Sequence, residues 1–170
     1  YHPYEVSKKS VDLIVKSFSH NLGLNILSIR PPNIYGGWDL NWDRIIPGTM
    51  KSIINRKRPV IRTDGSLLRS YLYVEDFVDA IIILAKKGLR KNTENCIYDI
   101  EGLKLHSTLE IVDKIINISG EKLIKPTITN VSKEEKFNLI PNVENSIRDL
   151  GWSPTYSIDS GLKQTLEWYK

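Results

Sequence analysis

Apolar side chains recur at a roughly helical spacing in the first part of the chain, at Val6, Val11, Leu13, Ile14 and Phe18. The spacing predicts a helix over residues 6–18, which Pro3 opens and Gly23 ends. Residues 25–30 then alternate aliphatic with small or polar side chains. They meet Pro31-Pro32, which cannot continue a helix and suits the end of a buried strand.

Turn signals dominate the next stretch. Residues 33–42 are rich in Gly, Asn and Trp and predict a loop. Residues 43–55 predict a helix, although an imperfect one, because Pro47 and Gly48 fall in its early turns.

Strand and helix patterns alternate through the middle of the chain. Residues 60–62 and 67–74 read as short strands flanking Asp64-Gly65, a pair suited to a tight turn, so we expect a β-hairpin. A helix is predicted over residues 75–87 and a strand over residues 96–100.

The last third begins with a strong helix start. Ser107 and Glu110 form a capping-box pattern, which predicts a helix that reaches Ser119 and ends at Gly120. After an extended stretch, two short helical segments are predicted, over residues 145–150 and 158–169. Strands that alternate with helices predict an α/β fold.

Composition narrows the class of protein. With 170 residues, 41% of them apolar, the chain can bury one core and part of another. The single cysteine, Cys96, excludes a disulfide framework, and no histidine pairing supports a metal site. No apolar run is long enough to span a bilayer, so we expect a cytoplasmic protein. The net charge of +4 is modest, with basic and acidic residues interspersed, so neither a nucleic-acid nor a membrane partner is expected.

The candidate chemistry concentrates near the first helix. Tyr4 and Lys8 are four residues apart, so on a helix they share one face and lie within reach of each other. A tyrosine hydroxyl ordinarily ionises near about pH 10, but a nearby cation favours the ionised form and makes a better base. An isolated pair of this kind is common on exposed helices. Tyr1 is the less suitable candidate, because Glu5 rather than a lysine follows it at the same spacing.

Several motifs in order carry a family resemblance, namely Pro3-Tyr4-Glu5-Val6-Ser7-Lys8, Arg30-Pro31-Pro32-Asn33-Ile34-Tyr35-Gly36, Arg69-Ser70-Tyr71-Leu72-Tyr73-Val74-Glu75-Asp76 and Leu150-Gly151-Trp152-Ser153-Pro154. The chain thereby resembles, over essentially its whole length, the carboxyl-terminal half of extended short-chain dehydrogenases/reductases (the NAD-dependent epimerase/dehydratase family). Residues 37–48 and 58–65 look specifically like CDP-glucose 4,6-dehydratases.

The resemblance implies a lyase activity. In that family NAD takes a hydride from C4 of glucose, water is lost across C5 and C6, and the hydride returns at C6, so CDP-glucose becomes its 4-keto-6-deoxy product. Tyr4 would take the C4 hydroxyl proton, and Lys8 would hold the nicotinamide ribose. Pro31 would also contact NAD. A full-length enzyme of this kind is expected to be a homodimer.

The resemblance also implies a substrate site. The residues expected to contact the nucleotide sugar are Asn33, Arg44, Arg62 and Arg69, because guanidinium groups match phosphate oxygens. Each has a simpler reading as a turn residue or a solvated arginine. Asp76 is expected to cap backbone amides. Trp38, Trp42 and Tyr35 are read more readily as packing residues than as ligand contacts.

The implied architecture is part of a Rossmann-type doubly wound sheet with a small α/β substrate-binding domain. Residues 1–35 would belong to the dinucleotide-binding domain and residues 36–170 mainly to the substrate domain, with 68–100 partly returning to the first. No glycine-rich phosphate loop occurs in these residues. We therefore expect a fragment that is inactive alone and exposes an apolar edge.

One residue departs from the family pattern, and the sequence is compatible with three alternative functions. Ser70 stands where these dehydratases commonly carry an aspartate; if that acid orients Arg69, Ser70→Asp would tighten substrate binding. The chain is otherwise compatible with a nucleotide-sugar epimerase, with a GDP-mannose 4,6-dehydratase, or with a non-catalytic nucleotide-sugar-binding remnant.

Overall fold

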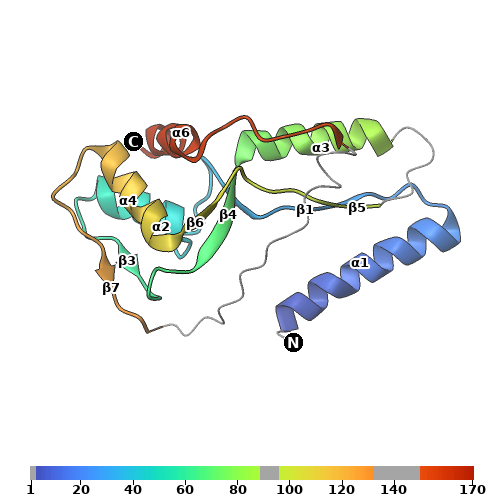
Figure 1. Ribbon diagram of the computed structural model, residues 1–170, viewed down its shortest axis with the longest axis horizontal. Helices are drawn as coiled ribbons and strands as arrows, with labels where there is room; N and C mark the ends of the chain where they lie inside the picture. Colours follow the sequence, from blue (N-terminus) through green and yellow to red (C-terminus); the bar gives the residue numbers. More distant parts are fainter. Residues whose placement is uncertain (1–2, 89–95, 132–149) are drawn as a thin grey trace. The chain divides into compact units, whose positions relative to one another are not determined.

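The computed structural model describes residues 3–88, 96–131 and 150–170 (Figure 1). They divide into two compact units. Unit 1 is drawn from Tyr1–Pro31, Val78–Ile100 and Pro141–Ser153, and unit 2 from Pro32–Phe77, Glu101–Ile140 and Pro154–Lys170. None of the described helices is long and apolar enough to cross a membrane.

Unit 1 combines a long helix with a short parallel sheet. Helix α1 spans Pro3–Leu22, which confirms and extends the predicted helix. Strand β1 (Ser28–Arg30) pairs in parallel with β5 (Ile97–Asp99), with Arg30 opposite Asp99. The amide of Ser28 donates to the carbonyl of Cys96 (2.7 Å). Both predicted strands are confirmed, although each is shorter than expected.

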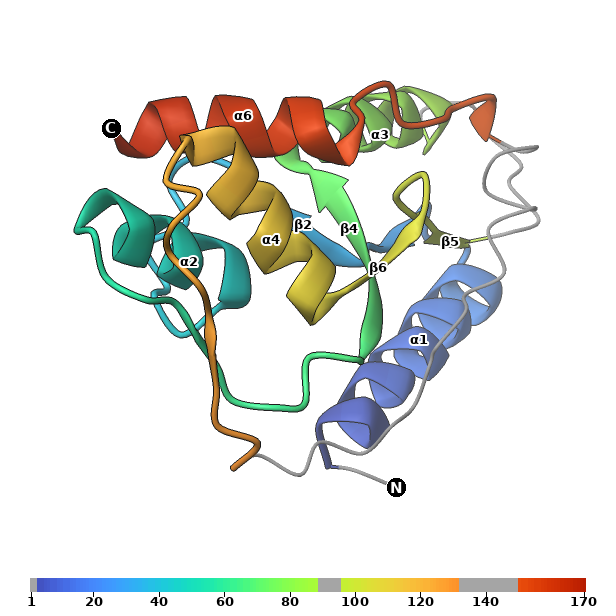
Figure 2. The ribbon, with the colours of Figure 1, turned by 60° about the vertical axis from the view of Figure 1, so that its left-hand side comes forward.

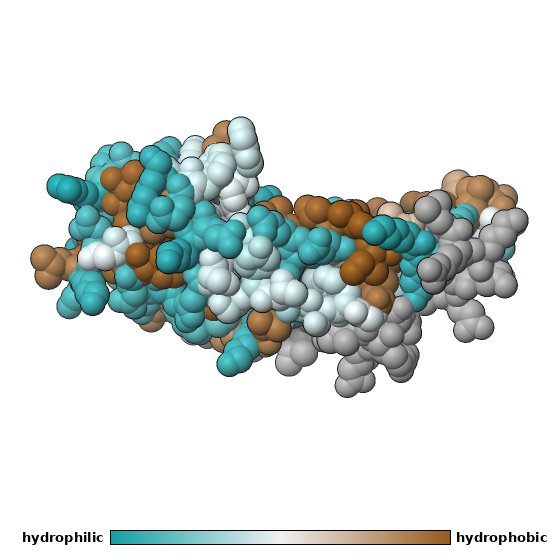
Figure 3. Space-filling view, turned by 90° about the horizontal axis from the view of Figure 1, so that it is seen from above, coloured by the Kyte–Doolittle hydropathy of each residue, from teal (hydrophilic) through white to brown (hydrophobic). Residues whose placement is uncertain are grey.

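Apolar side chains stay exposed on the helices of unit 1. No residue of α1 is buried, and its exposed apolar residues are Val6, Val11, Leu13, Ile14, Phe18 and Leu22. Helix α3 (Val74–Gly88) begins in unit 2 and continues in unit 1, where Val78, Ile81 and Ile82 are exposed. Figure 3 shows hydrophobic side chains gathered over α3. An amphipathic pattern thus predicts these helices, but the described residues leave the apolar side of α1 exposed and cover that of α3 only in part, at Ala80 and Leu84.

Unit 2 contains a mixed sheet of β2 (Asn33–Tyr35), β4 (Leu68–Tyr73) and β6 (Leu105–Ser107). Strand β4 is central, parallel to β2 and antiparallel to β6. The prediction of a loop from residue 33 is wrong for Asn33–Tyr35, because pairing with β4 draws this segment into the sheet. The sequence analysis also missed β6.

The prediction of a β-hairpin over residues 60–74 is wrong. Strand β3 (Val60–Ile61) pairs in parallel with β7 (Thr127–Ile128) instead of with β4. The turn itself is present, since Gly65 has a φ of +79° and the Asp64 carboxylate accepts a hydrogen bond from the amide of Ser66 (2.9 Å). The carbonyl of Gly65 accepts from the amide of Leu109 (3.0 Å), so the turn packs against a later helix.

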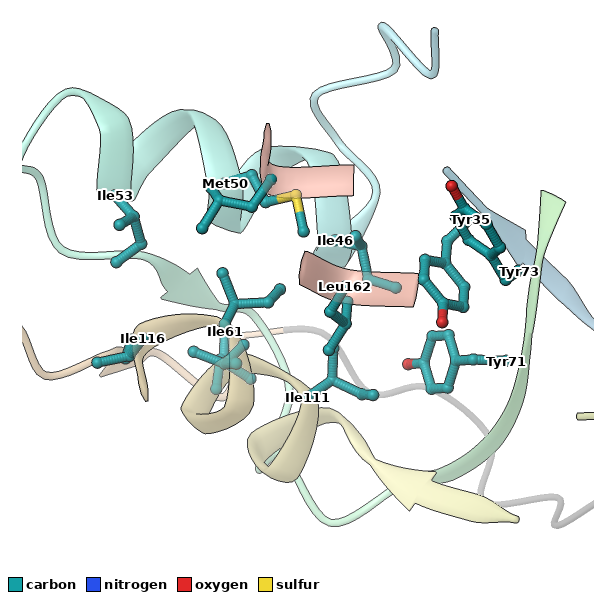
Figure 4. Close-up of a cluster of buried hydrophobic side chains, with 13 residues drawn as sticks. Tyr35, Ile46, Met50, Ile53, Ile61, Tyr71, Tyr73, Ile111, Ile116 and Leu162 are labelled. Atoms are coloured by element: carbon teal, nitrogen blue, oxygen red, sulfur yellow. The ribbon is translucent and has the colours of Figure 1, made fainter. Parts of the chain in front are cut away.

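Three helices cover the core of unit 2: α2 (Ile45–Ile54), α4 (Thr108–Ser119) and α6 (Ile158–Tyr169). Helix α4 packs on both α2 and α6 (Figure 2). Side chains from all three meet strand residues in the cluster of Figure 4, which includes Ile46, Met50, Ile111, Leu162, Ile61 and Tyr71. Pro47 does not interrupt α2, because it lies in the first turn, where a missing N–H costs no helical hydrogen bond.

The predicted caps of α4 are confirmed. The Ser107 hydroxyl accepts from the amide of Glu110, and Gly120 has a φ of 82°. The Glu110 carboxylate, however, lies 2.7 Å from Nδ1 of His106. Helix α6 matches its prediction, whereas the predicted segment over residues 145–150 lies, apart from Leu150, outside the described residues.

Candidate active site

Tyr4 and Lys8 lie on one exposed face of α1. The Lys8 ammonium is 5.4 Å from the centroid of the Tyr4 ring, as the four-residue spacing predicts. The Tyr4 side chain is 64% exposed. The pair therefore places a phenol beside a cation on an accessible surface, where both can reach a ligand.

A third residue extends this face by one more turn. Asp12 follows Lys8 by four residues, and its carboxylate lies 3.4 Å from Nη1 of Arg30. Nε of Arg30 lies 3.0 Å from the carboxylate of Asp99. Arg30 thus links α1 to the ends of β1 and β5. The sequence analysis missed this contact, although the repeated four-residue spacing from Tyr4 was a usable signal.

Burial and charge act in opposite directions on Asp99. Burial raises the pKa of its carboxyl, and the Arg30 guanidinium, the next largest influence, lowers it without cancelling the rise. The Arg30 link is therefore a partly desolvated ion pair at the carboxyl ends of two parallel strands. Ligands of open α/β sheets bind outside this edge. Pro31, exposed, directly follows β1 at the same edge.

The candidates for substrate contact lie in unit 2. Asn33 is exposed as the first residue of β2, opposite Tyr71 in the sheet. Arg44 precedes α2 as its N-cap residue, and its side chain makes no capping bond; Nη1 lies 3.1 Å from the Asp39 carboxylate. Arg62 follows β3, and its Nη2 lies 2.8 Å from the Asp43 carboxylate.

Arg62 pairs with Asp43, the residue that precedes Arg44 in the chain, whereas Arg44 pairs with Asp39. Both guanidinium groups are mostly exposed. Each is balanced by one carboxylate, and each offers a planar set of donors whose present partner a phosphate could replace.

Arg69 lies on β4, half-exposed and opposite His106. Its Nη1 donates to the carbonyl of Leu68 (3.2 Å). Ser70 is buried, and its hydroxyl accepts from the amide of Gly102 (2.9 Å). Successive strand residues point to opposite faces, which argues against the hypothesis that residue 70 orients Arg69.

Of the three aromatic residues considered earlier, Tyr35 is buried, whereas Trp42 is 39% and Trp38 80% exposed. The Tyr35 hydroxyl donates to the carbonyl of Ile158 (3.4 Å). Burial raises the pKa of Tyr35. The ring centroids of Trp38 and Trp168 lie 5.0 Å apart with the planes tilted by 51°, and those of Trp42 and Tyr169 lie 5.8 Å apart with a tilt of 55°. Tyr169 in turn donates to the carbonyl of Asp39 (2.5 Å), and burial raises its pKa to about 12.

Asp76 has the structural role that the sequence favoured, but with different partners. Its carboxylate binds the amides of Thr155 and Tyr156 rather than amides of its own helix. In the described part of the chain, no group of three or more His, Cys, Asp or Glu residues is arranged to hold a metal ion.

Tyr4, Lys8 and Pro31 thus belong to unit 1, and Asn33, Arg44, Arg62 and Arg69 to unit 2. Within each unit the candidates are accessible or half-exposed, and their chemistry suits a polar, anionic ligand. Neither the sequence nor the geometry alone names that ligand.

Comparison with known proteins identifies relatives. The family model described as "NAD dependent epimerase/dehydratase family" matches residues 1–100. The dTDP-glucose 4,6-dehydratase of Shigella flexneri is 28% identical over 172 residues, which cover 98% of this chain and 47% of the relative. A trifunctional UDP-glucose 4,6-dehydratase/UDP-4-keto-6-deoxy-D-glucose 3,5-epimerase/UDP-4-keto-L-rhamnose-reductase of Arabidopsis thaliana is 26% identical, with 99% and 24% covered.

Solved structures agree with these matches. The crystal structure of dTDP-glucose 4,6-dehydratase from Bacillus anthracis in complex with NAD has a TM-score of 0.83 at 27% identity, covering 99% of this chain and 52% of that one. UDP-glucose 4-epimerase from Thermotoga maritima has a TM-score of 0.85 at 22% identity, with 98% and 53% covered, and shows the fold alone. The α/β class is confirmed. The chain spans about half the length of the single-function dehydratases that it matches.

Proposed function

This chain belongs to the NAD-dependent epimerase/dehydratase family, and from that premise we propose that it forms part of an NAD-dependent nucleotide-sugar 4,6-dehydratase. The observation that carries the proposal is the exposed Tyr4–Lys8 pair, with the ammonium 5.4 Å from the phenol ring. A phenol beside a cation is suited to exchange a proton with a sugar hydroxyl.

The residues of unit 1 fit NAD as the cofactor. Lys8 is exposed and would donate hydrogen bonds to the nicotinamide ribose, and Pro31 would contact the cofactor beyond the carboxyl end of β1. When bound, NAD would supply the oxidant that takes a hydride from C4 and returns it at C6. Arg30 would hold the face of α1 against the strand ends through Asp12.

We assign the proton transfer to Tyr4. Its oxygen would accept the proton of the C4 hydroxyl, while the adjacent Lys8 ammonium stabilises the phenolate electrostatically. Loss of water across C5 and C6 needs further acid and base groups. We assign none of them within these residues.

In unit 2, the substrate's diphosphate would bind Arg44 and Arg62, which now pair with Asp39 and Asp43, with Arg69 and Asn33 as further contacts. The identity of the nucleobase in the substrate is also proposed. Residues 37–48 favour CDP-glucose, the substrate expected from the sequence. The relatives named as dTDP-glucose dehydratases make dTDP-glucose the second candidate.

The placement within a longer enzyme is also proposed. Unit 1 would be the carboxyl-terminal part of the dinucleotide-binding domain and unit 2 the substrate domain, which is supported by the division at Pro31 and by the return of Val78–Ile100 to unit 1. The homodimer, the cytoplasmic location and the inactivity of residues 1–170 alone remain predictions.

The test uses the full-length protein with NAD and a panel of CDP-glucose, dTDP-glucose, UDP-glucose and GDP-mannose. We expect a product lighter by one water molecule from CDP-glucose, detected by mass spectrometry. Tyr4→Phe should lower kcat by roughly 10²- to 10⁴-fold. Tyr1→Phe, the matched control, should leave kcat unchanged.

Other outcomes discriminate among the alternatives. A product of unchanged mass and altered stereochemistry would favour an epimerase. Dehydration of dTDP-glucose in preference to CDP-glucose would change only the nucleobase that we assign to the substrate. If no sugar nucleotide reacts but one binds, a non-catalytic binding protein is the better reading.

A further inference from the structure

Two basic segments, far apart in sequence, lie side by side in unit 2. The first follows α2 and the second follows α4, and they supply the cations Arg56, Lys57, Arg58, Lys122 and Lys125, which we call the basic surface. Nε of Arg58 donates to the carbonyl of Lys125 (3.0 Å). The amide of Thr127 donates to the carbonyl of Pro59 (2.8 Å) where β7 runs beside β3 (Figure 1).

The basic surface concentrates charge that is interspersed with acids along the sequence. Its five cations are exposed, and Glu121 is the acid within the same two segments. The five cations and Glu121 together carry a net charge of +4, which equals the formal net charge of the whole chain. The charges of all the other residues therefore cancel. Within the described residues no carboxylate pairs with any of the five cations. The fold therefore creates a local positive field.

Arg56 occupies a conformation that disfavours it. It follows the C-cap of α2 with a φ of 52°. Its amide donates to Ile53 and the amide of Lys57 donates to Ser52, the hydrogen bonds of a Schellman motif. Glycine is the usual residue here, because a side chain is strained in the left-handed region. Arg56 thus places a long cation where glycine would be less strained.

An aliphatic side chain projects among these cations. Ile124 packs against the core, and its amide donates to the carbonyl of Glu121 (3.0 Å), which closes a turn. Leu123, its neighbour, is 97% exposed between Lys122 and Lys125. Ile54, in the last turn of α2, is 41% exposed. At the left-hand end of Figure 3, hydrophobic side chains stand singly among hydrophilic ones.

We propose that the basic surface, with Leu123 as its apolar anchor, docks the protein on an anionic lipid bilayer. Lysines and arginines beside a projecting aliphatic side chain are the pattern of an interfacial contact, with the cations at the headgroups and the aliphatic group in the acyl boundary. A single-stranded nucleic acid is less suited, because neither segment contains an aromatic residue for base stacking. This contact would be peripheral and needs no membrane-spanning helix.

The surface lies at the opposite end of α2 from Arg44, one of the candidate substrate residues. Arg44 precedes the first turn of α2, and the basic surface follows its last turn. A helix of ten residues separates them by about 15 Å. The proposal does not rest on the proposed function, because it requires only the contacts of these two segments.

Co-sedimentation of the purified protein with vesicles tests the proposal. We expect binding to vesicles of equal parts phosphatidylcholine and phosphatidylglycerol, weakened by salt, and none to phosphatidylcholine alone. Arg56→Gly should weaken partition roughly fivefold while raising the thermal midpoint, because glycine relieves the backbone strain. Loss of binding with a gain in stability cannot come from misfolding.

Matched controls separate this surface from the exposed face of α1. Leu123→Ser should weaken partition, whereas Leu13→Ser on α1 should not; likewise Lys57→Ala should weaken it and Lys16→Ala should not. Equal binding to both kinds of vesicle, or no effect of Arg56→Gly, would overturn the proposal. The proposal would also be overturned if the protein bound a DNA duplex but no vesicles, and if Leu123→Ser left the affinity for the duplex unchanged.

Discussion

The Asp76 carboxylate accepts hydrogen bonds from both the amide and the hydroxyl of Thr155 (2.8 Å each), although the two residues are 79 positions apart. Its second oxygen accepts from the amide of Tyr156 (3.1 Å). Asp76 is 1% exposed. One buried side chain on α3 therefore fixes the segment that leads into α6.

Replacing Asp76 should destabilise unit 2 strongly. Asp76→Ala leaves two backbone amides without their acceptor, so we expect a loss of about 3 kcal/mol in the free energy of unfolding, measured by denaturant titration. Asp79→Ala, on an exposed position of the same helix, should change it by less than about 0.5 kcal/mol. Equal effects of the two substitutions would contradict the structural role of Asp76.

Gly102 should tolerate no side chain. A Cβ at this position would lie 2.0 Å from the carbonyl oxygen of Tyr71, a backbone atom that cannot move aside cheaply. We expect Gly102→Ala to cost about 2 kcal/mol of stability, measured as a lower denaturation midpoint. Lys104→Ala, an exposed position two residues later, is the control. An unchanged midpoint for Gly102→Ala would mean that this loop lies elsewhere.

The Arg30 ion pairs should matter more at neutral than at acidic pH. Burial holds the pKa of the Asp99 carboxyl above its ordinary value. The contribution of Asp99 to folding stability is therefore greatest at pH values below the ordinary pKa, and it is lost as the pH rises through the raised pKa. Arg30 attracts the ionised carboxylate and limits this loss. Arg30→Met should thus cost about 1 kcal/mol near neutral pH, the size of a partly exposed pair.

Near about pH 3, where carboxyls are largely neutral, the same substitution should cost less. Thermal unfolding at the two pH values measures the difference, with Lys16→Met on α1 as the charge-matched control. A cost that does not change with pH would show that packing of the Arg30 side chain, rather than its charge, links α1 to the strands.

Alkaline pH should destabilise unit 2 through its tyrosines. Burial raises the pKa of Tyr169 from 10.0 to about 12. The unfolded chain then loses its proton first, so stability is complete below pH 10 and falls as pH rises toward 12. Tyr169→Phe should lower stability at neutral pH, because the hydrogen bond to Asp39 is lost, but should flatten the decline above pH 10. An unaltered slope would contradict this assignment.

Local chemistry accounts for what sequence reasoning predicted well. Ser107 and Gly120 mark the ends of α4 because capping bonds and a left-handed terminal residue involve only near neighbours. The Tyr4–Lys8 contact follows from helical spacing alone. Family motifs located the other candidates, but their spacing along the chain carried no information on which charges would meet.

Pairing over long distances accounts for the errors. The Asp64-Gly65 turn is real, yet Ile61 becomes buried beside β7 rather than in a hairpin with β4. Asn33–Tyr35 reads as a loop by composition, but β4 supplies the hydrogen bonds that make it a strand. A turn and a short apolar run are compatible with several partners, and packing of the whole unit chooses among them.

The sequence by itself determined most of the described helices, the caps of α4, the α/β class and the contact between Tyr4 and Lys8, because these depend mainly on residues close together in the chain. Only the tertiary structure decided that Arg62 pairs with Asp43, that Asp76 binds Thr155, and that two basic segments lie side by side. Such contacts depend on which buried strands and helices pack together, and that choice rests on the burial of apolar area throughout the unit.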